Sequence, residues 1–395
     1  FASSYMNWDG VNNTDNFSGS YPSGLELPED ILIDSTGRLY VADTWNNRVL
    51  RWDTPTSTTD INADFVFGQG GDFYTESPNY QGSPAGDSLD APTGLNMDDL
   101  GRLYVVDQGN NRVLRFDSPS DNYTASAVCG QPNLFSNSIN RLDGAGVNYP
   151  YDVAFDFNSS PLHFYVVDQT NNRVLGWDTW QDAMAGLEAD IVLGQPDAYS
   201  TNAGCDRNKF SFPMSVIVDK NSVVWISDSQ NSRVVGFEDP FANDLLADYV
   251  LGQTSFLDAF ANGSSGTPSA STLNYPAGIY VNPTGTGLWV ADNSNHRILY
   301  YSDPYNTGPS ASMVIGQQTF LQANPNDPDV SAKTLNGPLD VFVDSIDNLY
   351  VCDSFNNRAL LYFAPHSTGE SADRVFGQPD QFSTNQQDIG STVTA

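Results

Sequence analysis

The chain is poor in positive charge, in histidine and cysteine, and in long apolar runs. Its 395 residues include 16 Lys and Arg against 48 Asp and Glu, which gives a formal net charge of −32. Nucleic acids and anionic membrane surfaces bind proteins that present clustered basic residues, so this charge contradicts nucleic-acid binding and disfavours anionic membrane surfaces. No stretch approaches the roughly 20 consecutive apolar residues of a membrane-spanning helix, and we expect no membrane insertion.

Reactive side chains are also scarce, and this limits the chemistry that the chain can perform. The three histidines share no metal-ligand spacing, which argues against a zinc site. There is no Gly-x-Ser-x-Gly nucleophile motif and no Gly-rich phosphate loop. Nothing singles out a pair of the 48 acids for acid–base catalysis, so we predict no catalytic residue and no enzyme activity. We expect no disulfide among Cys129, Cys205 and Cys352.

One pattern recurs six times along the chain, and each copy ends in Val-x-Gly-Gln or a close variant. A regular period of this kind indicates supersecondary units that pack on their neighbours. The units open with prolines that lie 58 to 64 residues apart: Pro28, Pro92, Pro150, Pro213, Pro276 and Pro338. Each unit also carries an Asp-x4-Arg pair: Asp43/Arg48, Asp107/Arg112, Asp168/Arg173, Asp228/Arg233, Asp292/Arg297 and Asp353/Arg358.

The first unit predicts four antiparallel strands and no helix. Residues 31–33 are continuously apolar, as in a strand buried on both faces, and 34–37 have the Asp and Gly of a type I turn. Residues 39–42 and 49–52 are enriched in aromatic and branched side chains, and 64–69 supply the last strand. The unit is therefore a four-stranded antiparallel meander.

Two recurrent aromatic positions indicate how the units pack. One lies three residues before the repeat Asp and the other four residues after the repeat Arg, as Tyr40 and Trp52 do. Such rings fill the wedge between twisted sheets. No terminal unit resembles a polar cap, so we predict radial closure into an all-β, six-bladed β-propeller of four-stranded antiparallel blades. The expected organisation is an N-terminal arm that closes the ring (1–27), the propeller (28–378) and a C-terminal tail (379–395).

The motifs at 39–43 (Leu-Tyr-Val-Ala-Asp) and 43–48 (Asp-Thr-Trp-Asn-Asn-Arg) resemble the NHL repeat, and the resemblance covers about nine tenths of the chain. The added Val-x-Gly-Gln segments are similar to those of long-repeat exported bacterial NHL proteins. The resemblance implies a propeller but no single activity, because NHL propellers include RNA binders, an amidating lyase domain, sensors and adhesion modules. That lyase domain uses a histidine-bound metal, from which this histidine-poor chain departs.

Sixfold repetition assigns the Asp-x4-Arg pairs to the scaffold. A short turn brings the Asp and the Arg to the ends of consecutive strands, where the carboxylate accepts turn amides and the guanidinium fork. We interpret all twelve residues as a structural latch that joins strands.

The position two residues after each repeat proline carries an aspartate in three units. In a propeller the first strand is innermost, so Asp30, Asp152 and Asp340 are expected around one mouth of the central channel. Three converging carboxylates, helped by backbone and water oxygens, could hold Ca²⁺. The alternative is a solvated acidic funnel without an ion. No cofactor other than calcium is indicated.

The longest variable segments connect the last strand of one unit to the first strand of the next, for example 70–91, 196–212 and 254–275. All six are expected to cross the same face of the disc. Functional contacts of propellers tend to use such loops, whereas the alternative is that these loops only seal the blade junctions. The candidate interaction surface consists of Tyr74, Tyr80, Phe135, Tyr199, Phe256 and Phe260.

Both ends of the chain suit the same slot between the sixth and first units. Residues 1–7 and 382–385 each resemble the sequence that follows Gly-Gln in the repeats. Either both segments share the slot, or one docks on a neighbouring copy and propagates a filament.

The composition, with abundant Asn, Ser, Thr and Asp and only three Lys, suits an exported protein of the cell envelope, periplasm or extracellular space. Five Asn-x-Ser/Thr triplets are candidate glycosylation sites, although such triplets also arise by chance in a chain of this composition. They begin at Asn12, Asn16, Asn122, Asn158 and Asn262.

We therefore expect an exported, non-enzymatic NHL-type propeller that acts as a rigid interaction or structural module. Its partner would be a protein, a glycan or a copy of itself bound through the termini. The alternative is a calcium-dependent hydrolase or lyase with its site at the acidic mouth of the channel. RNA binding, which some NHL propellers perform, is contradicted by the charge.

Overall fold

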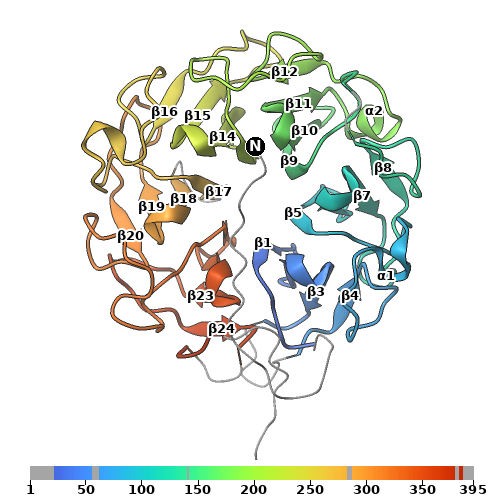
Figure 1. Cartoon of the computed structure of the whole chain (residues 1–395), viewed down its shortest axis with the longest axis horizontal. Coiled ribbons are helices and arrows are strands. Elements are labelled where there is room, and N and C mark those ends of the chain that lie inside the picture. Colours follow the sequence, from blue (N-terminus) through green and yellow to red (C-terminus); the bar gives the residue numbers. More distant parts are fainter. Residues whose placement is uncertain (1–21, 56–61, 140–141, 283–286, 379–381, 386–395) are drawn as a thin grey trace, which may run out of the picture.

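Six four-stranded antiparallel sheets stand around a central axis as the blades of a propeller (Figure 1). The structure is a computed structural model that describes residues 22–55, 62–139, 142–282, 287–378 and 382–385. In each sheet the strands pair in chain order, with the first strand nearest the axis and the fourth at the rim. This arrangement confirms the predicted all-β, six-bladed architecture.

The strands follow the predicted repeat. Blades one and two contain β1 (Pro28–Ile33), β2 (Leu39–Asp43), β3 (Arg48–Trp52), β4 (Phe65–Phe67), β5 (Pro92–Met97), β6 (Leu103–Asp107), β7 (Arg112–Phe116) and β8 (Ala127–Cys129). Blades three and four contain β9 (Pro150–Asp156), β10 (His163–Asp168), β11 (Arg173–Trp177), β12 (Ile191–Leu193), β13 (Pro213–Val218), β14 (Val223–Asp228), β15 (Arg233–Glu238) and β16 (Tyr249–Leu251). Blades five and six contain β17 (Pro276–Val281), β18 (Leu288–Asp292), β19 (Arg297–Tyr301), β20 (Met313–Ile315), β21 (Asp340–Val343), β22 (Leu349–Asp353), β23 (Arg358–Tyr362) and β24 (Arg374–Phe376).

Helical structure is limited to short connections. A 3-10 turn follows the second strand of every blade, as at Thr44–Asn46 in the first. The sequence did not predict α1 (Asn79–Gly82) or α2 (Trp180–Met184). The Thr179 hydroxyl caps α2, because it accepts a hydrogen bond from the Asp182 N–H at 3.1 Å. In the first blade β4 is shorter than predicted, because Gly68 adopts a φ of 100° and turns the chain out of the ladder.

All twelve recurrent aromatic residues are buried, which confirms their predicted place in the core. Rings also meet between blades: those of Phe67 and Phe116 lie 5.2 Å apart at an angle of 71°. Across the junction between the last and the first blade, the rings of Trp52 and Phe376 lie 6.0 Å apart. Pairs at such separations add to the stabilisation that burial alone provides.

The ring closes without a shared sheet. Each blade takes its four strands from one continuous segment, and among the described residues no strand N-terminal to β1 joins blade six. The innermost strand β1 nevertheless contacts both β5 and β21, as a closed ring requires. Closure therefore depends on side-chain and loop contacts across the junction.

The Gly-Gln segment is one such contact, and it recurs at all six junctions. Each of these glycines has a φ between 84° and 100° and lies directly against an apolar side chain three residues before the next repeat proline. A Cβ at any of these glycines would overlap that side chain. The pairs are Gly68/Leu89, Gly130/Val147, Gly194/Phe210, Gly252/Leu273, Gly316/Leu335 and, across the closing junction, Gly377/Leu25.

A second recurrent contact starts from the left-handed residue that ends each 3-10 turn. In blade one this residue, Asn47, accepts a hydrogen bond through its side-chain oxygen from the Ala91 N–H at 2.8 Å, just before the next repeat proline. The closing junction has the same bond, from the Leu27 N–H to Asn357 at 3.0 Å. In blade five His296 takes this place and accepts from the Gly337 N–H through Nδ1. Residues 22–27 thus join blade six to blade one.

We predict that Leu25→Ala destabilises the protein as much as the equivalent change inside the ring. Both Leu25 and Leu273 are completely buried against a junction glycine. Removing such a side chain costs about 2–5 kcal/mol of unfolding free energy. Urea denaturation of Leu25→Ala and Leu273→Ala, followed by tryptophan fluorescence, measures both. A loss confined to Leu273→Ala would show that the closing junction does not hold the ring.

Candidate functional site

The six Asp-x4-Arg pairs form ion pairs of 2.6–2.7 Å, and both partners of every pair are inaccessible to solvent. In blade four Arg233 Nε donates to Asp228, and Nη1 donates to the carbonyl of Phe256 in the following loop. Its Nη2 donates to the carbonyls of Asp206 and Lys209 in the preceding loop, both at 2.9 Å. The arginine therefore ties its own blade to the loops on both sides.

The aspartate of each pair fixes the chain that enters its blade. Its second oxygen accepts the N–H of the residue two positions before the repeat proline, at 2.7 Å in all six blades, as from Ser211 to Asp228. Burial raises the pKa of Asp228 to about 6, and the charge of Arg233 opposes this shift. Each latch guanidinium donates to a carboxylate and to backbone carbonyls of the chain. The latch residues are inaccessible to solvent and therefore cannot contact a ligand.

We predict that Arg233→Met lowers the unfolding free energy by about 3–5 kcal/mol, because the substitution leaves the buried Asp228 carboxylate without its counter-ion. The matched control is Arg207→Met, since Arg207 pairs with Asp248 at the partly exposed surface. Exposed pairs contribute about 0–1 kcal/mol. Chemical denaturation of both variants compares the two losses. Equal losses would contradict the role of the buried pair as a latch.

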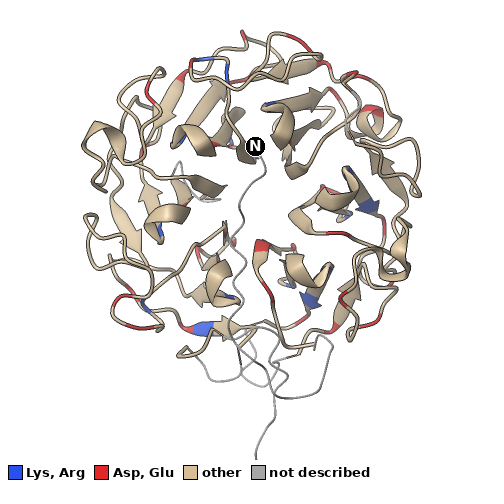
Figure 2. Cartoon of the chain, viewed as in Figure 1, with Lys and Arg blue, Asp and Glu red and all other residues tan. Residues whose placement is uncertain are grey.

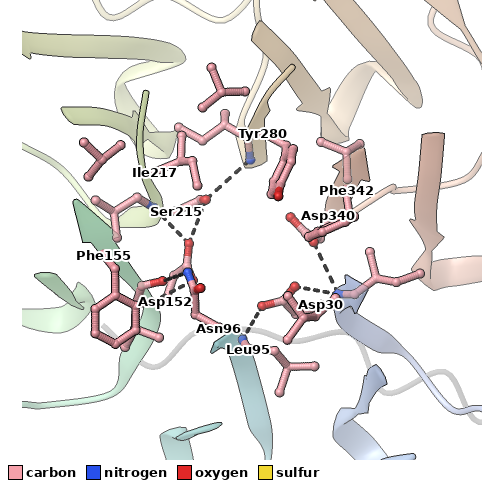
Figure 3. Close-up of a pocket in the computed structure, with 18 of the residues that line it drawn as sticks. Asp30, Leu95, Asn96, Asp152, Phe155, Ser215, Ile217, Tyr280, Asp340 and Phe342 are labelled. Atoms are coloured by element: carbon pink, nitrogen blue, oxygen red, sulfur yellow. Dashed lines mark hydrogen bonds between the residues drawn. The ribbon is translucent and has the colours of Figure 1, made fainter. Parts of the chain in front are cut away.

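The three aspartates at the second position after the proline line a cavity of about 210 Å³ in the channel (Figure 3). Each accepts hydrogen bonds from the innermost strand of the next blade. Asp30 accepts the Leu95 N–H at 2.5 Å, and Asp340 accepts the Ile31 N–H at 3.3 Å. Asp152 accepts the hydroxyl of Ser215 at 2.8 Å. These carboxylates thus link neighbouring blades around the axis.

Two other blades carry glycine at this position because the next blade approaches too closely for a side chain. A Cβ on Gly94 would overlap the backbone of Asp152, and one on Gly278 would overlap Asp340. The two glycines of this series are therefore explained by the close approach of the neighbouring inner strands.

Burial raises the pKa of all three channel carboxyls, so each stays protonated to a higher pH than an exposed aspartate does. It raises the pKa of Asp340 to about 8 and that of Asp152 to about 6. Burial and then the adjacent Asp340 raise the pKa of Asp30 well above its ordinary value. Two carboxyls so close together favour sharing one proton over ionising together.

The three aspartates of the predicted calcium site have different surroundings. Asp30 and Asp340 interact directly, whereas Asp152 is held by blade four. Within the described residues, no three His, Cys, Asp or Glu side chains are grouped as metal ligands would be. Calcium binding by Asp30, Asp152 and Asp340 stays a prediction, and all three carboxylates already serve as hydrogen-bond acceptors between or within blades.

A further acid that the sequence analysis did not single out, Glu29, lies at the start of β1, next to Pro28. The Tyr151 hydroxyl reaches across from blade three and donates to Glu29 at 2.8 Å. Burial raises the pKa of Glu29 to about 7, and this hydrogen bond opposes the shift. Both residues directly follow a repeat proline, which is the signal that could have placed them together.

The raised pKa of Asp340 predicts a stability that falls as pH rises. The folded state holds the proton up to about pH 8, while the unfolded carboxyl releases it near 3.8. The stabilisation is complete below the lower value and is lost as pH rises through the higher one. Between pH 5 and pH 8 the unfolding free energy of Asp340→Asn should decrease by about 1–3 kcal/mol less than that of the parent protein.

Thermal and urea unfolding at both pH values measure this difference. Asp121→Asn is the matched control, because Asp121 is an exposed residue of a surface loop. A variant with the same pH dependence as the parent protein would show that the channel carboxyls ionise freely.

The predicted loop aromatics differ in exposure. Tyr74, Phe135, Tyr199 and Phe260 are 61–73% exposed. Tyr80 and Phe256 are only partly exposed. The ring of Tyr80 packs over Gly70, and the ring of Phe256 lies 5.4 Å from the Arg207 guanidinium.

Three exposed aromatic residues on the same face were missed. Trp45 and Phe355 occupy the second place of the 3-10 turns in blades one and six, and they are 55% and 51% exposed. Tyr149 precedes a repeat proline with a left-handed φ of 50°, a conformation that a large side chain rarely adopts. The signal for Trp45 and Phe355 was a ring where the other four blades carry Gly, Thr, Gln or Ser. Tyr149 stands at a position that is also aromatic in two other blades, as Phe212 and Tyr275.

The candidate glycosylation sites are not equivalent. Asn12 and Asn16 lie outside the described residues. Asn122 and Asn158 are exposed, although the Asn158 amide donates to Asp156 and to a blade-four carbonyl. Asn262 is buried, and its amide exchanges two hydrogen bonds with Asn295. A glycan on Asn262 would require this pair to break, which argues against that site.

The three cysteines are free thiols.

A model of the NHL repeat matches residues 25–52 and 273–301. Human NHL repeat-containing protein 2 is 24% identical over 310 residues, which cover 73% of this chain and 40% of that protein. The chain is an NHL-repeat propeller. Within its described part, the NHL propeller has no helix long and apolar enough to cross a bilayer.

Other proteins similar to this NHL propeller include a teneurin and two lyases. Teneurin-3 of Danio rerio is 25% identical over 67% of this chain and 10% of that protein. A probable peptidyl-alpha-hydroxyglycine alpha-amidating lyase of Caenorhabditis elegans is 27% identical over 37% of this chain and 36% of that protein. A solved streptogramin B lyase aligns over 94% of both chains with 12% identity and a TM-score of 0.48. The chain thus spans less than half the length of the curated relatives.

Proposed function

We propose that this NHL propeller is an exported, non-enzymatic module that holds a partner protein against one rigid face. This face, here called the loop face, consists of the blade-to-blade connections and the turns between second and third strands. Both sets of segments leave the antiparallel sheets at the same edge, so they lie on one side of the disc. The low Lys content and abundant Asn and Ser support export.

The distribution of exposed aromatic residues carries the proposal. Of ten exposed Trp, Tyr and Phe side chains among the described residues, seven belong to the loop face. Rings exposed on one side of a protein supply large contact area, and aromatic residues are enriched at the energetic centres of protein interfaces. The seven are Trp45, Tyr74, Phe135, Tyr149, Tyr199, Phe260 and Phe355.

The buried latches make this face a prepared surface. Each latch arginine donates to a carbonyl in the loop before its blade and to another in the loop after it, as Arg297 does to Ser269 and Phe320. Loops held in this way lose little conformational freedom when a partner binds, and binding is less costly for that reason.

The net charge of −32 favours a partner whose binding surface has basic residues around the apolar groups that contact the exposed rings. Asp and Glu are spread around the disc, and Lys and Arg are sparse (Figure 2). Opposite charge on the partner would raise the association rate and suppress wrong partners. A glycan partner, or a copy of the chain bound through the termini, falls under the same proposal. Residues 382–385 reach the slot after blade six, where the Phe382 carbonyl accepts from Arg358.

The competing function is an enzyme, because one relative is a probable lyase. A calcium-dependent hydrolase or lyase would place its site in the channel cavity. Incubation with peptidyl-hydroxyglycine and with model ester and glycoside substrates, with and without Ca²⁺, tests this alternative. Turnover that is lost in Asp30→Asn or Asp152→Asn would overturn the proposal.

We predict that Trp45→Ser combined with Phe355→Ser weakens partner binding at least tenfold. The two rings lie on neighbouring blades of the loop face, and their removal takes away exposed contact area without touching the core. The matched control is Phe157→Ser with Phe363→Ser, because both rings are exposed in connections on the opposite face, after β9 and after β23.

The partner is first captured from the source's own extracellular fraction and purified, and calorimetry then measures its affinity for each variant. Light scattering of the propeller alone reports self-assembly. The proposal is wrong if only the opposite-face variant loses affinity, or if neither variant does.

A further inference from the structure

A second pocket lies on the face opposite the loop face, where blades four and five meet. It has a volume of about 320 Å³, and its lining residues are Asn221, Val223, Glu238, Asp239, Asn243, Tyr249 and Tyr305. Val223, Glu238 and Tyr249 are end residues of β14, β15 and β16 in blade four, and Asn221, Asp239 and Asn243 belong to the connections beside these strands. Tyr305 comes from the connection between β19 and β20 of blade five and reaches across the junction.

Aromatic rings build one wall of this pocket. Tyr249 stacks on the buried Trp225, with 5.6 Å between centroids and 25° between planes. Tyr305 lies 5.8 Å from Trp225 and stands edge-on to Tyr249, at 5.6 Å and 80°. Because both tyrosines rest on a buried tryptophan, their positions are set by the core and not by the loop alone.

The polar groups of the pocket are held in fixed directions. The Tyr305 hydroxyl donates to Asp219 at 2.7 Å and accepts from the Asn221 amide at 3.0 Å. The Tyr249 hydroxyl donates to Glu238, and this hydrogen bond raises the pKa of Tyr249 to about 12. The Asn243 amide donates to the Glu238 carbonyl at 2.8 Å. Planar amides and carboxylates thus surround the two phenol rings.

Size and charge narrow the class of ligand. Pockets for small molecules usually measure about 300–1,000 Å³, so this one suits a single ring-sized group. Its lining residues include the acids Glu238 and Asp239 but no Lys or Arg, which disfavours anionic ligands. Every lining side chain except Val223 ends in a hydrogen-bonding group. A ligand with many hydroxyls and one apolar face matches this lining.

We propose that this pocket, the blade four–five pocket, binds one neutral pyranose unit of a glycan. The C–H face of the sugar packs on the electronegative π face of one of the two rings and its edge meets the other, because Tyr249 and Tyr305 stand at 80° to each other. Its hydroxyls donate to Glu238 and Asp239 and accept from the amides of Asn221 and Asn243.

Equivalent junctions carry other side chains. Between blades three and four, Phe241 stacks on His163 with 3.9 Å between centroids and offers no hydroxyl. Between blades two and three, the guanidinium groups of Arg102 and Arg115 lie 4.1 Å and 4.6 Å from the Trp180 ring. Of these three junctions, the one with Tyr305 presents two phenol rings beside amides and acids.

The inference deepens the glycan branch of the proposed function, but it uses the opposite face of the disc. Failure of the loop-face variants to lose a protein partner would therefore leave it untouched. Conversely, a blade four–five pocket without sugar affinity would not contradict protein docking on the loop face.

The test is a saccharide panel with the whole protein. Saturation-transfer NMR and calorimetry are run with methyl β-glucopyranoside, methyl β-galactopyranoside, methyl α-mannopyranoside, cellotriose and maltotriose. Glucuronic acid and glucosamine serve as the anionic and cationic counterparts. We expect at least one neutral saccharide to bind at millimolar concentration or better, and glucuronic acid to bind at least tenfold more weakly than that sugar.

The variants locate the binding. Asn243→Ala removes one amide at an exposed position, and Tyr305→Phe keeps the ring against Trp225 but removes the hydroxyl that orients Asn221. Each should weaken binding at least fivefold while the melting temperature stays within a few degrees. Tyr199→Ala on the loop face is the control and should bind as the parent protein does.

Three outcomes would overturn the inference. They are absence of binding to every neutral sugar of the panel, unchanged binding in both Asn243→Ala and Tyr305→Phe, and tighter binding of glucosamine or glucuronic acid than of the neutral sugars.

Discussion

The fold depends on keeping six arginines entirely out of water. A buried guanidinium is tolerated only when a carboxylate balances its charge and carbonyls accept its remaining N–H groups. In this chain the carboxylate comes from the same turn, and the carbonyls come from the loops before and after the blade, as around Arg233. Two irregular loops of roughly twenty residues are therefore fixed by each charge. The same constraint that stabilises the ring turns its most variable segments into an ordered surface.

Much of this architecture could be predicted from the sequence because it repeats. The prolines, the Asp-x4-Arg pairs and the two aromatic positions recur with a steady period, so the blade number, the strand order and the buried rings followed. The Gly-Gln segment was recognised as part of the repeat, but its role was not. Only the structure shows that each glycine receives an apolar side chain from the next blade, as Gly377 receives Leu25. That partner recurs three residues before every repeat proline, but nothing in the local sequence shows that it meets a glycine of the preceding blade.

The candidate sites were less predictable, because they depend on where non-repeating groups meet. Position in the repeat was enough to direct Asp30, Asp152 and Asp340 to the channel, but it could not show that neighbouring strands donate hydrogen bonds to their carboxylates. Trp45 and Phe355 were overlooked because their turns had been read as scaffold alone. Tyr305 lies in a connection without any pattern, and its hydrogen bond to Asp219 spans 86 positions of the chain. Contacts of that kind follow from the assembled ring and not from a local motif.

In the part of the chain that the structure describes, the first and last blades share no strand, and this has a mechanical consequence. The described chain enters the disc at residues 22–27 and leaves it at 382–385, on the two sides of one junction. Tension applied at residues 22 and 385 would pull this junction apart, and no β-ladder between described strands crosses the junction to resist it. A single rupture there would convert the closed disc into an arc of intact blades before any individual sheet unravels. A propeller built this way has a defined point of mechanical failure, and its yield force would be set by a handful of side chains.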